Sequence, residues 1–371
     1  MRAQVIAYVV GARPNLVKMA PVIRELRRRL PGARHLIVHT GQHYDWVMSD
    51  IFVKQLGMPS PDRVLGVGSA SHAVQTARAM ERLEAVFELE RPELVIVAGD
   101  VNSTLAATLV AVKLGIPLGH VESGLRSFDR TMPEEVNRIV ADEFAKYLFA
   151  HCEDALENLR AEGIEGDRVH LVGNTMIDSL VLMERSFRAL EAWRRFGLRA
   201  GEYLLVTLHR PALVDGPRLG EVLDRLGSLS RELPVLFPLH PRTRKMMNGL
   251  PVERGVLLTE PFGYLDFLSL EANAAAVLTD SGGVQEETTY LGVPCFTLRD
   301  NTERPVTLSR GTNTLLGLNP ARIDGILPAL QSGKPRAGPP ALWDGRAAER
   351  IAAVVARSLE GEPLELVGAQ T

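Results

Sequence analysis

The segment from Ala276 to Glu287 places the strongest local constraint on the fold, because a strand-length apolar run meets a helical pattern with only Asp-Ser-Gly-Gly between them. A buried parallel strand that feeds a helix through so short a turn leaves backbone N–H groups pointing at the turn. Gly282 and Gly283 carry no Cβ, so an anion such as a diphosphate can approach closely. The third residue after Ser281 is Val284, so no capping-box carboxylate occupies those donors. The segment therefore predicts either an anion site or an ordinary tight turn.

Strand-length apolar runs alternate with helical patterns along the whole chain. In the first half, the expected strands are Val5–Val10, His35–His39, Leu94–Ala98, Pro117–Val121, Tyr147–Ala150 and Val169–Val172. In the second half they are Tyr203–Leu208, Val235–Leu239, Val256–Thr259, Ala276–Thr279 and Pro294–Thr297. Helical periodicity is clearest at His72–Leu89, Leu219–Leu233, Tyr264–Ala275 and Gly345–Leu359. This order predicts parallel sheets covered by helices on both faces.

A chain of 371 residues exceeds the size at which one hydrophobic core stops growing, so two domains are expected. The pattern changes to a long charged helical segment from Asn174 to Arg195, which suits a connector. We therefore predict an α/β fold with two doubly wound, Rossmann-like domains facing a cleft. The expected bounds are 1–173, joined by a C-terminal helical segment 345–371, and 174–344.

The composition argues against several classes of partner. A net charge of −3 with 46% apolar residues gives no overall field for nucleic acid or membranes. The apolar runs are far shorter than a membrane span, and Val5–Val10 is not followed by a cleavage site for a signal peptide. Cys152 and Cys295 lie in separate apolar contexts, which suggests packed thiols in a reducing cytoplasm and no metal-ligand spacing.

Polar residues follow the ends of many predicted strands. In an open parallel sheet, ligands bind beyond the carboxyl ends of the strands, so these residues are expected in one cleft. They are Arg13, Gln42, His43, Asp100, Glu122, His209, His240 and Ser281. The first turn, Gly-Ala-Arg-Pro, lacks the G-x-G-x-x-G fingerprint, and Gly66-Val-Gly68-Ser-Ala-Ser matches it only in part. No nicotinamide cofactor is therefore expected.

Two arginines are candidates for binding phosphate. Arg13 follows the first strand and offers a planar guanidinium suited to phosphate oxygens. Arg304, in Asp-Asn-Thr-Glu-Arg-Pro, is a second candidate, although an ion pair with Glu303 or Asp300 is an alternative explanation.

Carboxylates gather in the first half. Glu122 ends a strand in Gly-His-Val-Glu-Ser-Gly, where no helix start explains it. Glu134 and Glu135 follow Met-Pro at a helix start, where the helix dipole accounts for one of them. Asp100 either belongs to the site or caps the following helix.

Two histidines of the second half, His209 and His240, also follow strands, and imidazole transfers protons near neutral pH. No histidine spacing indicates a metal site.

These motifs resemble the non-hydrolysing UDP-N-acetylglucosamine 2-epimerases, which have a two-domain, glycosyltransferase-B-like fold. The resemblance runs from Val5 to Gly317. It rests on Gly-Ala-Arg-Pro-Asn-Leu-Val-Lys-Met-Ala-Pro, Gly-Asp-Val-Asn-Ser-Thr-Leu-Ala, Gly-His-Val-Glu-Ser-Gly-Leu-Arg, Met-Pro-Glu-Glu-Val-Asn-Arg, Gly-Asn-Thr-Met-Ile-Asp, Thr-Asp-Ser-Gly-Gly-Val-Gln-Glu-Glu and Arg-Asp-Asn-Thr-Glu-Arg-Pro.

The resemblance implies interconversion of UDP-GlcNAc and UDP-ManNAc, in which UDP leaves, 2-acetamidoglucal forms and UDP adds again with C2 inverted. It implies no cofactor, a UDP-sugar as the bound partner and a homodimer. The catalytic residues that it implies are Asp100, Glu122, Glu134 and His209. The substrate-binding residues are Arg13, Lys18, Phe267, Ser281, Gly282, Gly283, Glu287 and Arg304, with Glu287 at the ribose and Phe267 near the uracil.

Three segments depart from the pattern of many bacterial members. Arg210-Pro211-Ala212-Leu213 replaces Arg-Arg-Glu-Asn, and Gly41-Gln42-His43-Tyr44 replaces Ala-Gln-His-Arg, so an activator site for a second UDP-sugar is not implied. Gln42, His43 and His240 remain accessory candidates. The segment 127–130 replaces a Thr-Gly pair, which leaves a related sugar such as a diacetamido uronic acid as an alternative substrate. A glycosyltransferase of the same fold, a hydrolysing epimerase and a sugar-nucleotide sensor are further alternatives.

Overall fold

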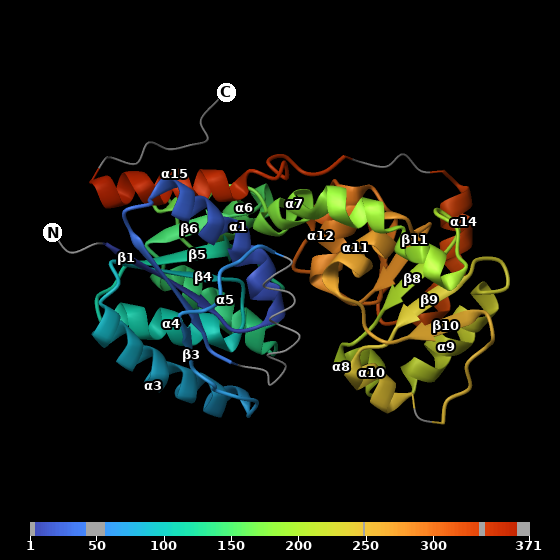
Figure 1. Ribbon diagram of the computed structural model, residues 1–371. Coiled ribbons are helices and arrows are strands. Elements are labelled where there is room, and N and C mark those ends of the chain that lie inside the picture. The colour runs from blue at the N-terminus through green and yellow to red at the C-terminus, as the bar shows by residue number, and fades with distance from the viewer. Residues whose placement is uncertain (1–3, 42–55, 248, 334–337, 362–371) are drawn as a thin grey trace. The chain divides into compact units, whose positions relative to one another are not determined.

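The structure is a computed structural model that describes residues 4–41, 56–247, 249–333 and 338–361. The chain divides into two compact units (Figure 1). Unit 1 contains residues 1–182 and 341–371, and unit 2 contains residues 183–340. Each unit is built on its own parallel sheet.

Unit 1 has a seven-stranded sheet in the order β3-β2-β1-β4-β5-β6-β7, and its strands pair in parallel. The strands are β1 (Val5–Val10), β2 (Arg34–His39), β3 (Arg63–Val64), β4 (Leu94–Ala98), β5 (Leu118–Ser123), β6 (Tyr147–Ala150) and β7 (Val169–Leu171). The helices are α1 (Arg13–Arg29), α3 (His72–Glu90), α4 (Asn102–Lys113), α5 (Pro133–Phe144), α6 (Glu153–Ala161), α7 (Thr175–Leu190), which ends in unit 2, and α15 (Ala347–Glu360).

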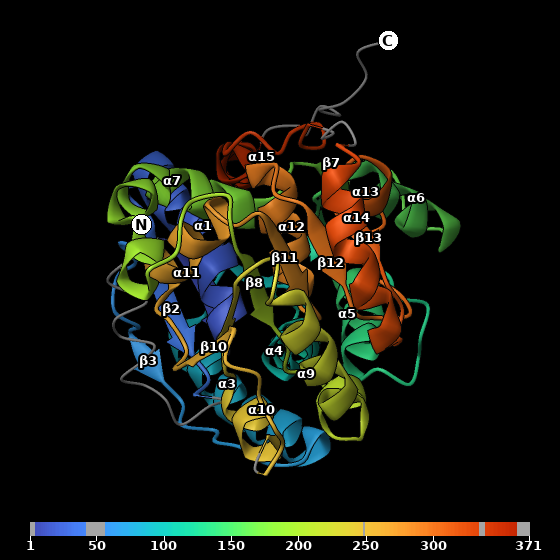
Figure 2. The ribbon, with the colours of Figure 1, turned by 90° about the vertical axis from the view of Figure 1, so that its right-hand side faces the viewer.

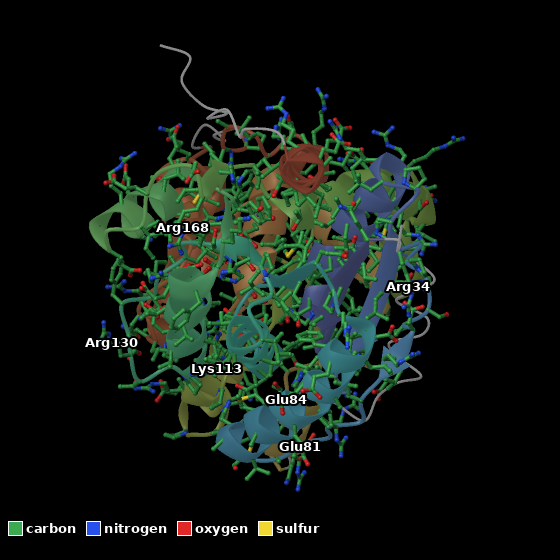
Figure 3. The ribbon with its side chains drawn as sticks, turned by 90° about the vertical axis from the view of Figure 1, so that its left-hand side faces the viewer. Arg34, Glu81, Glu84, Lys113, Arg130 and Arg168 are labelled. Carbon is green, nitrogen blue, oxygen red and sulfur yellow. The ribbon has the colours of Figure 1, made fainter. Side chains whose placement is uncertain are left out.

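The helices of unit 1 form because their apolar residues recur once per turn. In α3 the buried positions include Ala79, Leu83 and Phe87, which are four residues apart and line one face of the helix. The opposite face carries exposed charged residues such as Glu81 and Glu84, which point outward from the unit (Figure 3). Burial of one face against the sheet accounts for the core between α3, α4 and the strands.

The C-terminal helix α15 packs against α1 within unit 1. Its first turn is held by Asp178 of α7, whose carboxylate accepts hydrogen bonds from the backbone N–H groups of Ala347 (3.1 Å) and Ala348 (2.7 Å). These two donors would otherwise have no partner at a helix start, so a residue distant in sequence caps the helix.

Unit 2 has a six-stranded parallel sheet in the order β10-β9-β8-β11-β12-β13, with β8 and β11 adjacent near its middle (Figure 2). The strands are β8 (Leu204–Thr207), β9 (Val235–Pro238), β10 (Val256–Thr259), β11 (Ala276–Thr279), β12 (Cys295–Thr297) and β13 (Asn313–Leu315). The helices are η1 (Ala192–Phe196), α8 (Pro211–Val214), α9 (Arg218–Leu229), α10 (Pro241–Met246), α11 (Tyr264–Ala272), α12 (Gly282–Leu291), α13 (Val306–Ser309), η2 (Pro320–Gly325) and α14 (Ile326–Gln331).

The predicted fold class is confirmed, and each sheet reverses its strand order once, between β1 and β4 and between β8 and β11. The short strands β3 and β13 were not predicted. Two helices end earlier than expected, α9 at Leu229 and α11 at Ala272, because the apolar residues that follow pack in the core as irregular chain. Among the described helices, none is long and apolar enough to cross a membrane.

Candidate active site

The strand-order reversal of unit 1 brings the ends of β1 and β4 together, and this is where an open parallel sheet binds ligands. Gly99 follows β4 with φ of 63°, which glycine adopts without strain. A Cβ at this position would lie 3.1 Å from Lys18 Nζ and 3.2 Å from Glu122 Oε2. Gly99 therefore keeps open the space into which these two side chains project.

Glu122 lies at a distortion of the sheet. The register between β5 and β6 shifts between Val121 and Ser123, and Glu122 has φ of 68°. Such a bulge re-aims a side chain, and a left-handed φ costs a non-glycine residue roughly 1–3 kcal/mol. The carboxylate forms a buried ion pair with Lys18 of α1, and each residue is only 7% exposed. Strain and a buried charge pair at one strand end are typical of a functional residue.

Asn15 fixes the start of α1 against β4. Its Nδ2 donates to the carbonyl of Ala98 at 2.7 Å, and its Oδ1 lies 3.3 Å from the backbone nitrogens of Gly11 and Ala12. Lys18 lies one turn further along α1, so this amide sets the position of the lysine. Sequence analysis did not single out Asn15, although it lies in the first motif.

Asp100 does not cap α4, because the residue at the N-cap of that helix is Val101. Its carboxylate instead forms an ion pair with Arg138 of α5, whose side chain is 4% exposed. Asn137 donates to the backbone carbonyl of Asp100 at 2.8 Å. The start of α5 therefore holds Asp100 in place from both its side chain and its backbone.

The two glutamates that begin α5 have different environments. Glu135 is buried and accepts hydrogen bonds from the backbone N–H groups of Ser127 (2.9 Å) and Phe128 (2.8 Å). Its Oε2 also lies 2.8 Å from Arg138 Nη1. Glu134 is half-buried and makes none of these contacts. Glu135 therefore holds the loop at Ser127 and Phe128 against α5, whereas Glu134 makes none of these contacts and stays a catalytic candidate.

A buried charged network lies under these strand ends. His120 has one ring nitrogen 2.6 Å from Asp142 Oδ1 and the other 2.9 Å from the carbonyl of Gly99. Asp142 also accepts from Arg126 Nη1 at 2.7 Å and from the backbone N–H of Gly124 at 3.0 Å. Burial raises the pKa of Asp142, but these positive and donor groups outweigh burial and hold the pKa below its ordinary value. The network ties Gly99 to α5 from inside the sheet.

In unit 2 the strand-order reversal places the end of β8 beside the end of β11. His209 Nδ1 lies 3.0 Å from Asp280 Oδ1, and Asp280 Oδ2 accepts from the backbone N–H groups of His209 (2.8 Å) and Arg210 (2.7 Å). Burial raises the pKa of Asp280, but the hydrogen bonds from His209 and the backbone lower it below its ordinary value. A carboxylate on Nδ1 fixes the imidazole so that Nε2 is the nitrogen available for proton transfer.

The turn after β11 has the geometry of an anion site. Ser281 is the N-cap of α12, and its side chain makes no capping hydrogen bond. A Cβ on Gly282 would lie 2.5 Å from Arg304 Nη1 and 2.9 Å from its Cζ. The guanidinium of Arg304 therefore lies directly against the first turn of α12, where backbone N–H groups and the helix dipole favour a negative charge.

Arg304 also belongs to an ion-pair cluster, as the alternative explanation for it proposed. Its Nε lies 3.0 Å from Glu286 Oε1 and its Nη1 lies 3.4 Å from Glu303 Oε2. Glu303 pairs with Arg299 at 2.7 Å and lies 3.7 Å from Arg210. Burial raises the pKa of Glu303, but these arginines hold it far below its ordinary value. The cluster keeps Arg304 charged and fixed beside Gly282.

Of the remaining candidates of unit 2, Phe267 lies on α11, Glu287 on α12 and His240 at the N-cap of α10. Glu287 is 5% exposed, and its Oε1 accepts a hydrogen bond from the hydroxyl of Tyr264 at 2.7 Å. Phe267 is partly buried against the core of the unit. His240 lies with its ring centre 5.4 Å from that of His209. Burial and the charge of His209 lower the pKa of His240.

Three sequence candidates fall outside this description. Gln42 and His43 are not among the described residues, and only the backbone of Arg13 is described, at the start of α1. In the described part of the chain, no group of three or more His, Cys, Asp or Glu residues is placed to hold a metal ion.

Two Rossmann-like units with polar residues at the reversal of each sheet define an α/β protein of the glycosyltransferase-B-like class. The sequence profile of the family described as UDP-N-acetylglucosamine 2-epimerase matches residues 24–356. The chain belongs to this family.

The UDP-N-acetylglucosamine 2-epimerase of Methanocaldococcus jannaschii is 40% identical over 362 residues, which cover 94% of this chain and 98% of that protein. A crystal structure of the M. jannaschii UDP-GlcNAc 2-epimerase in complex with UDP-GlcNAc and UDP superposes with a TM-score of 0.85 and 39% identity, covering 95% of this chain and 99% of that one. The UDP-2,3-diacetamido-2,3-dideoxy-D-glucuronate 2-epimerase of Pseudomonas aeruginosa is 40% identical over 314 residues, which cover 83% of this chain and 87% of that protein.

Proposed function

We propose that this protein is a UDP-N-acetylglucosamine 2-epimerase that interconverts UDP-GlcNAc and UDP-ManNAc by eliminating and re-adding UDP through 2-acetamidoglucal. The observation that carries the proposal in the structure is the buried Lys18–Glu122 pair on the strained bulge at the end of β5. A carboxylate that is re-aimed by the fold and paired with an ammonium group is suited to removing and returning a proton.

The chemistry requires both a leaving group and a proton-transfer group. The C2 hydrogen of the sugar is not acidic, because no carbonyl adjoins C2. Departure of UDP from C1 gives oxocarbenium character, and that positive charge makes the C2 hydrogen removable. Re-addition of a proton to the opposite face of the glucal, with return of UDP, inverts C2. No electron leaves or enters the sugar, so the reaction needs no redox cofactor.

Unit 1 supplies the carboxylates. Glu122, with Lys18 as its counter-ion, is assigned as a proton-transfer group at C2. Asp100 and Glu134 are assigned to stabilise the positive charge at C1 and to carry the second proton transfer. Arg138 and Asn137 hold Asp100 for this role.

Unit 2 supplies the nucleotide site. The first turn of α12, opened by Gly282 and Gly283, and the guanidinium of Arg304 are assigned to the diphosphate. Both stabilise the negative charge that grows as UDP departs. Glu287 is assigned to the ribose hydroxyls, and His209, oriented by Asp280, to proton transfer through its Nε2.

The test is NMR spectroscopy of the purified protein with UDP-GlcNAc in D₂O. The C2 epimer and deuterium at C2 are expected to appear together, and Glu122→Gln is expected to abolish both. Because the P. aeruginosa relative is as similar as the M. jannaschii one, UDP-2,3-diacetamido-2,3-dideoxy-D-glucuronate belongs in the same assay. If only the diacetamido uronic acid is turned over, that sugar is assigned as the substrate in place of UDP-GlcNAc. If neither sugar gains deuterium at C2, the proposal is refuted.

A further inference from the structure

Glu271 is a fully buried carboxyl group to which the proposed mechanism gives no role. It lies near the end of α11 with 0% exposure. Among the residues that the structure describes, none donates a hydrogen bond to either of its carboxyl oxygens. An ionised carboxylate in such a place is very unfavourable, so a buried group of this kind takes up a proton or finds a partner.

Glu271 lies on the same face of α11 as Tyr264, the residue that contacts Glu287. Tyr264 and Glu271 are seven residues apart on α11, which is two helical turns, so they share one face. The Tyr264 hydroxyl donates to Glu287 Oε1 at 2.7 Å, so this face of α11 is the one that meets α12. The face therefore presents two groups to α12, a phenol at one end and a carboxyl at the other.

The charges around Glu271 favour its neutral form. Burial, and then the negative charge of Glu287, raise the pKa of Glu271 well above its ordinary value. Burial raises the pKa of Tyr203 and of Cys295, both of which interact with Glu271, so this phenol and this thiol are neutral and offer Glu271 no counter-charge. A neutral carboxylic acid has one O–H to donate, and the carboxylate of Glu287 is an acceptor that it can satisfy.

We propose that Glu271 is a positioning residue that carries a proton and donates a hydrogen bond to Glu287, so that the Glu287 carboxylate is held for the 2′- and 3′-hydroxyls of the nucleotide. The two carboxyl groups share one negative charge. Tyr264 and Glu271 donate to this carboxylate from its buried side, and the carboxylate accepts the vicinal diol of the ribose. This inference rests on the proposed function, in which Glu287 contacts the ribose.

Two variants separate the hydrogen bond from mere packing. Glu271→Gln keeps the shape and a neutral donor, whereas Glu271→Leu keeps the bulk and removes the donor. The readout is the ratio of the dissociation constants for 2′,3′-dideoxy-UDP and UDP by calorimetry. The wild-type ratio is expected to be about 10–100, because a hydrogen bond to a charged group contributes about 1.5–3 kcal/mol.

Glu271→Gln is expected to keep this ratio within about threefold, and Glu271→Leu to lower it toward one while the affinity for 2′,3′-dideoxy-UDP changes little. An unchanged ratio in Glu271→Leu would show that Glu271 only fills space and would overturn the proposal. A ratio near one in the wild type would show that Glu287 does not bind the ribose hydroxyls, and this would refute the proposal. The proposed epimerase activity would still be tested independently by the D₂O assay.

Infrared difference spectra of wild type and Glu271→Gln in D₂O at neutral pD test the proton directly. The wild type is expected to show the C=O stretch of a protonated carboxyl group that the variant lacks. Its absence would mean that Glu271 is ionised, which contradicts the proposal whatever the binding data show. Circular dichroism and unfolding by denaturant confirm that both variants are folded before the measurements are compared.

Discussion

Lys18 and Glu122 form a buried ion pair between α1 and the bulge at the end of β5, although 104 residues separate them in sequence. Both residues are buried, so the attraction between them offsets part of the cost of removing each charge from water. The pairing also has a chemical consequence. A proton acceptor must be ionised before it acts, and the ammonium group of Lys18 is a counter-ion for that form of Glu122.

Lys18→Met tests this dependence. We expect a loss of about 100-fold or more in kcat, because Glu122 loses the buried ammonium group that favours its ionised, basic form. Removing one partner of a buried pair is also expected to cost about 3–5 kcal/mol in the free energy of unfolding. Deuterium incorporation at C2 and denaturant titration measure the two effects.

The double variant Lys18→Met with Glu122→Gln provides the internal check, because it removes both charges of the buried pair. It is expected to regain most of the stability but none of the activity. Lys113→Met, at the exposed end of α4, is the matched control and should change stability by no more than about 0.5 kcal/mol. Full activity in Lys18→Met would contradict the proposed role of the pair.

The glutamates at the start of α5 are expected to give opposite results. Glu134→Gln should abolish turnover and leave the free energy of unfolding within about 1 kcal/mol, since no described hydrogen bond is lost. Glu135→Gln should lower stability by about 1.5–3 kcal/mol, because it weakens bonds to two backbone N–H groups and Arg138. If Glu134→Gln is the destabilised variant, the assignment is reversed.

The sequence predicted most of the fold because its signals are local. Five strands, β1, β4, β6, β10 and β11, have the bounds that their apolar runs indicate, and β11 ends where Asp280 begins the turn. The strands β3 and β13 are two and three residues long, too short to show a period. β5 extends past Val121 because the bulge at Glu122 lengthens the strand, and a bulge leaves no mark in the hydrophobic pattern.

The site was harder to predict, because its contacts join residues far apart in the chain. The resemblance to a family indicated Asp100, Glu122, Glu134 and, as a substrate-binding residue, Lys18. The pairing of Lys18 with Glu122 and of Arg138 with Asp100 follows only from the way the sheet is folded. Helix-start signals are the same for Glu134 and Glu135, so they cannot show which of the two is catalytic. The structure distinguishes them because Glu135 accepts hydrogen bonds from the loop at Ser127 and Phe128.

Asp178 should make folding stability depend on pH. Burial raises its pKa from 3.8 to about 6, although the N–H groups of Ala347 and Ala348 act in the opposite direction. The folded state therefore holds the proton over a pH range where the unfolded state has lost it, and stability falls as the pH rises from about 4 to about 6. The contribution amounts to roughly 3 kcal/mol for a shift of this size.

Asp178→Asn removes this titration. The free energy of unfolding of the variant, relative to wild type, is expected to increase with pH over the same range and to level off above it. Denaturant unfolding at several pH values measures the difference, and the exposed Asp224→Asn serves as the control. A difference that stays constant with pH would show that Asp178 titrates alike in both states.

Gly282→Ala tests the diphosphate site without removing a charge. The new Cβ would meet the guanidinium of Arg304 at 2.5 Å, so Arg304 must move from the first turn of α12 and strain its pair with Glu286. We expect the affinity for UDP to fall at least tenfold, about 1.4 kcal/mol, while the weaker affinity for uridine is unchanged.

Gly220→Ala in α9, where the nearest atom would be 4.0 Å away, is the matched control and should bind both ligands normally. Calorimetry with UDP and uridine distinguishes the outcomes. An equal loss for both ligands would indicate a general disturbance of unit 2, and no loss for either would remove the diphosphate from the start of α12.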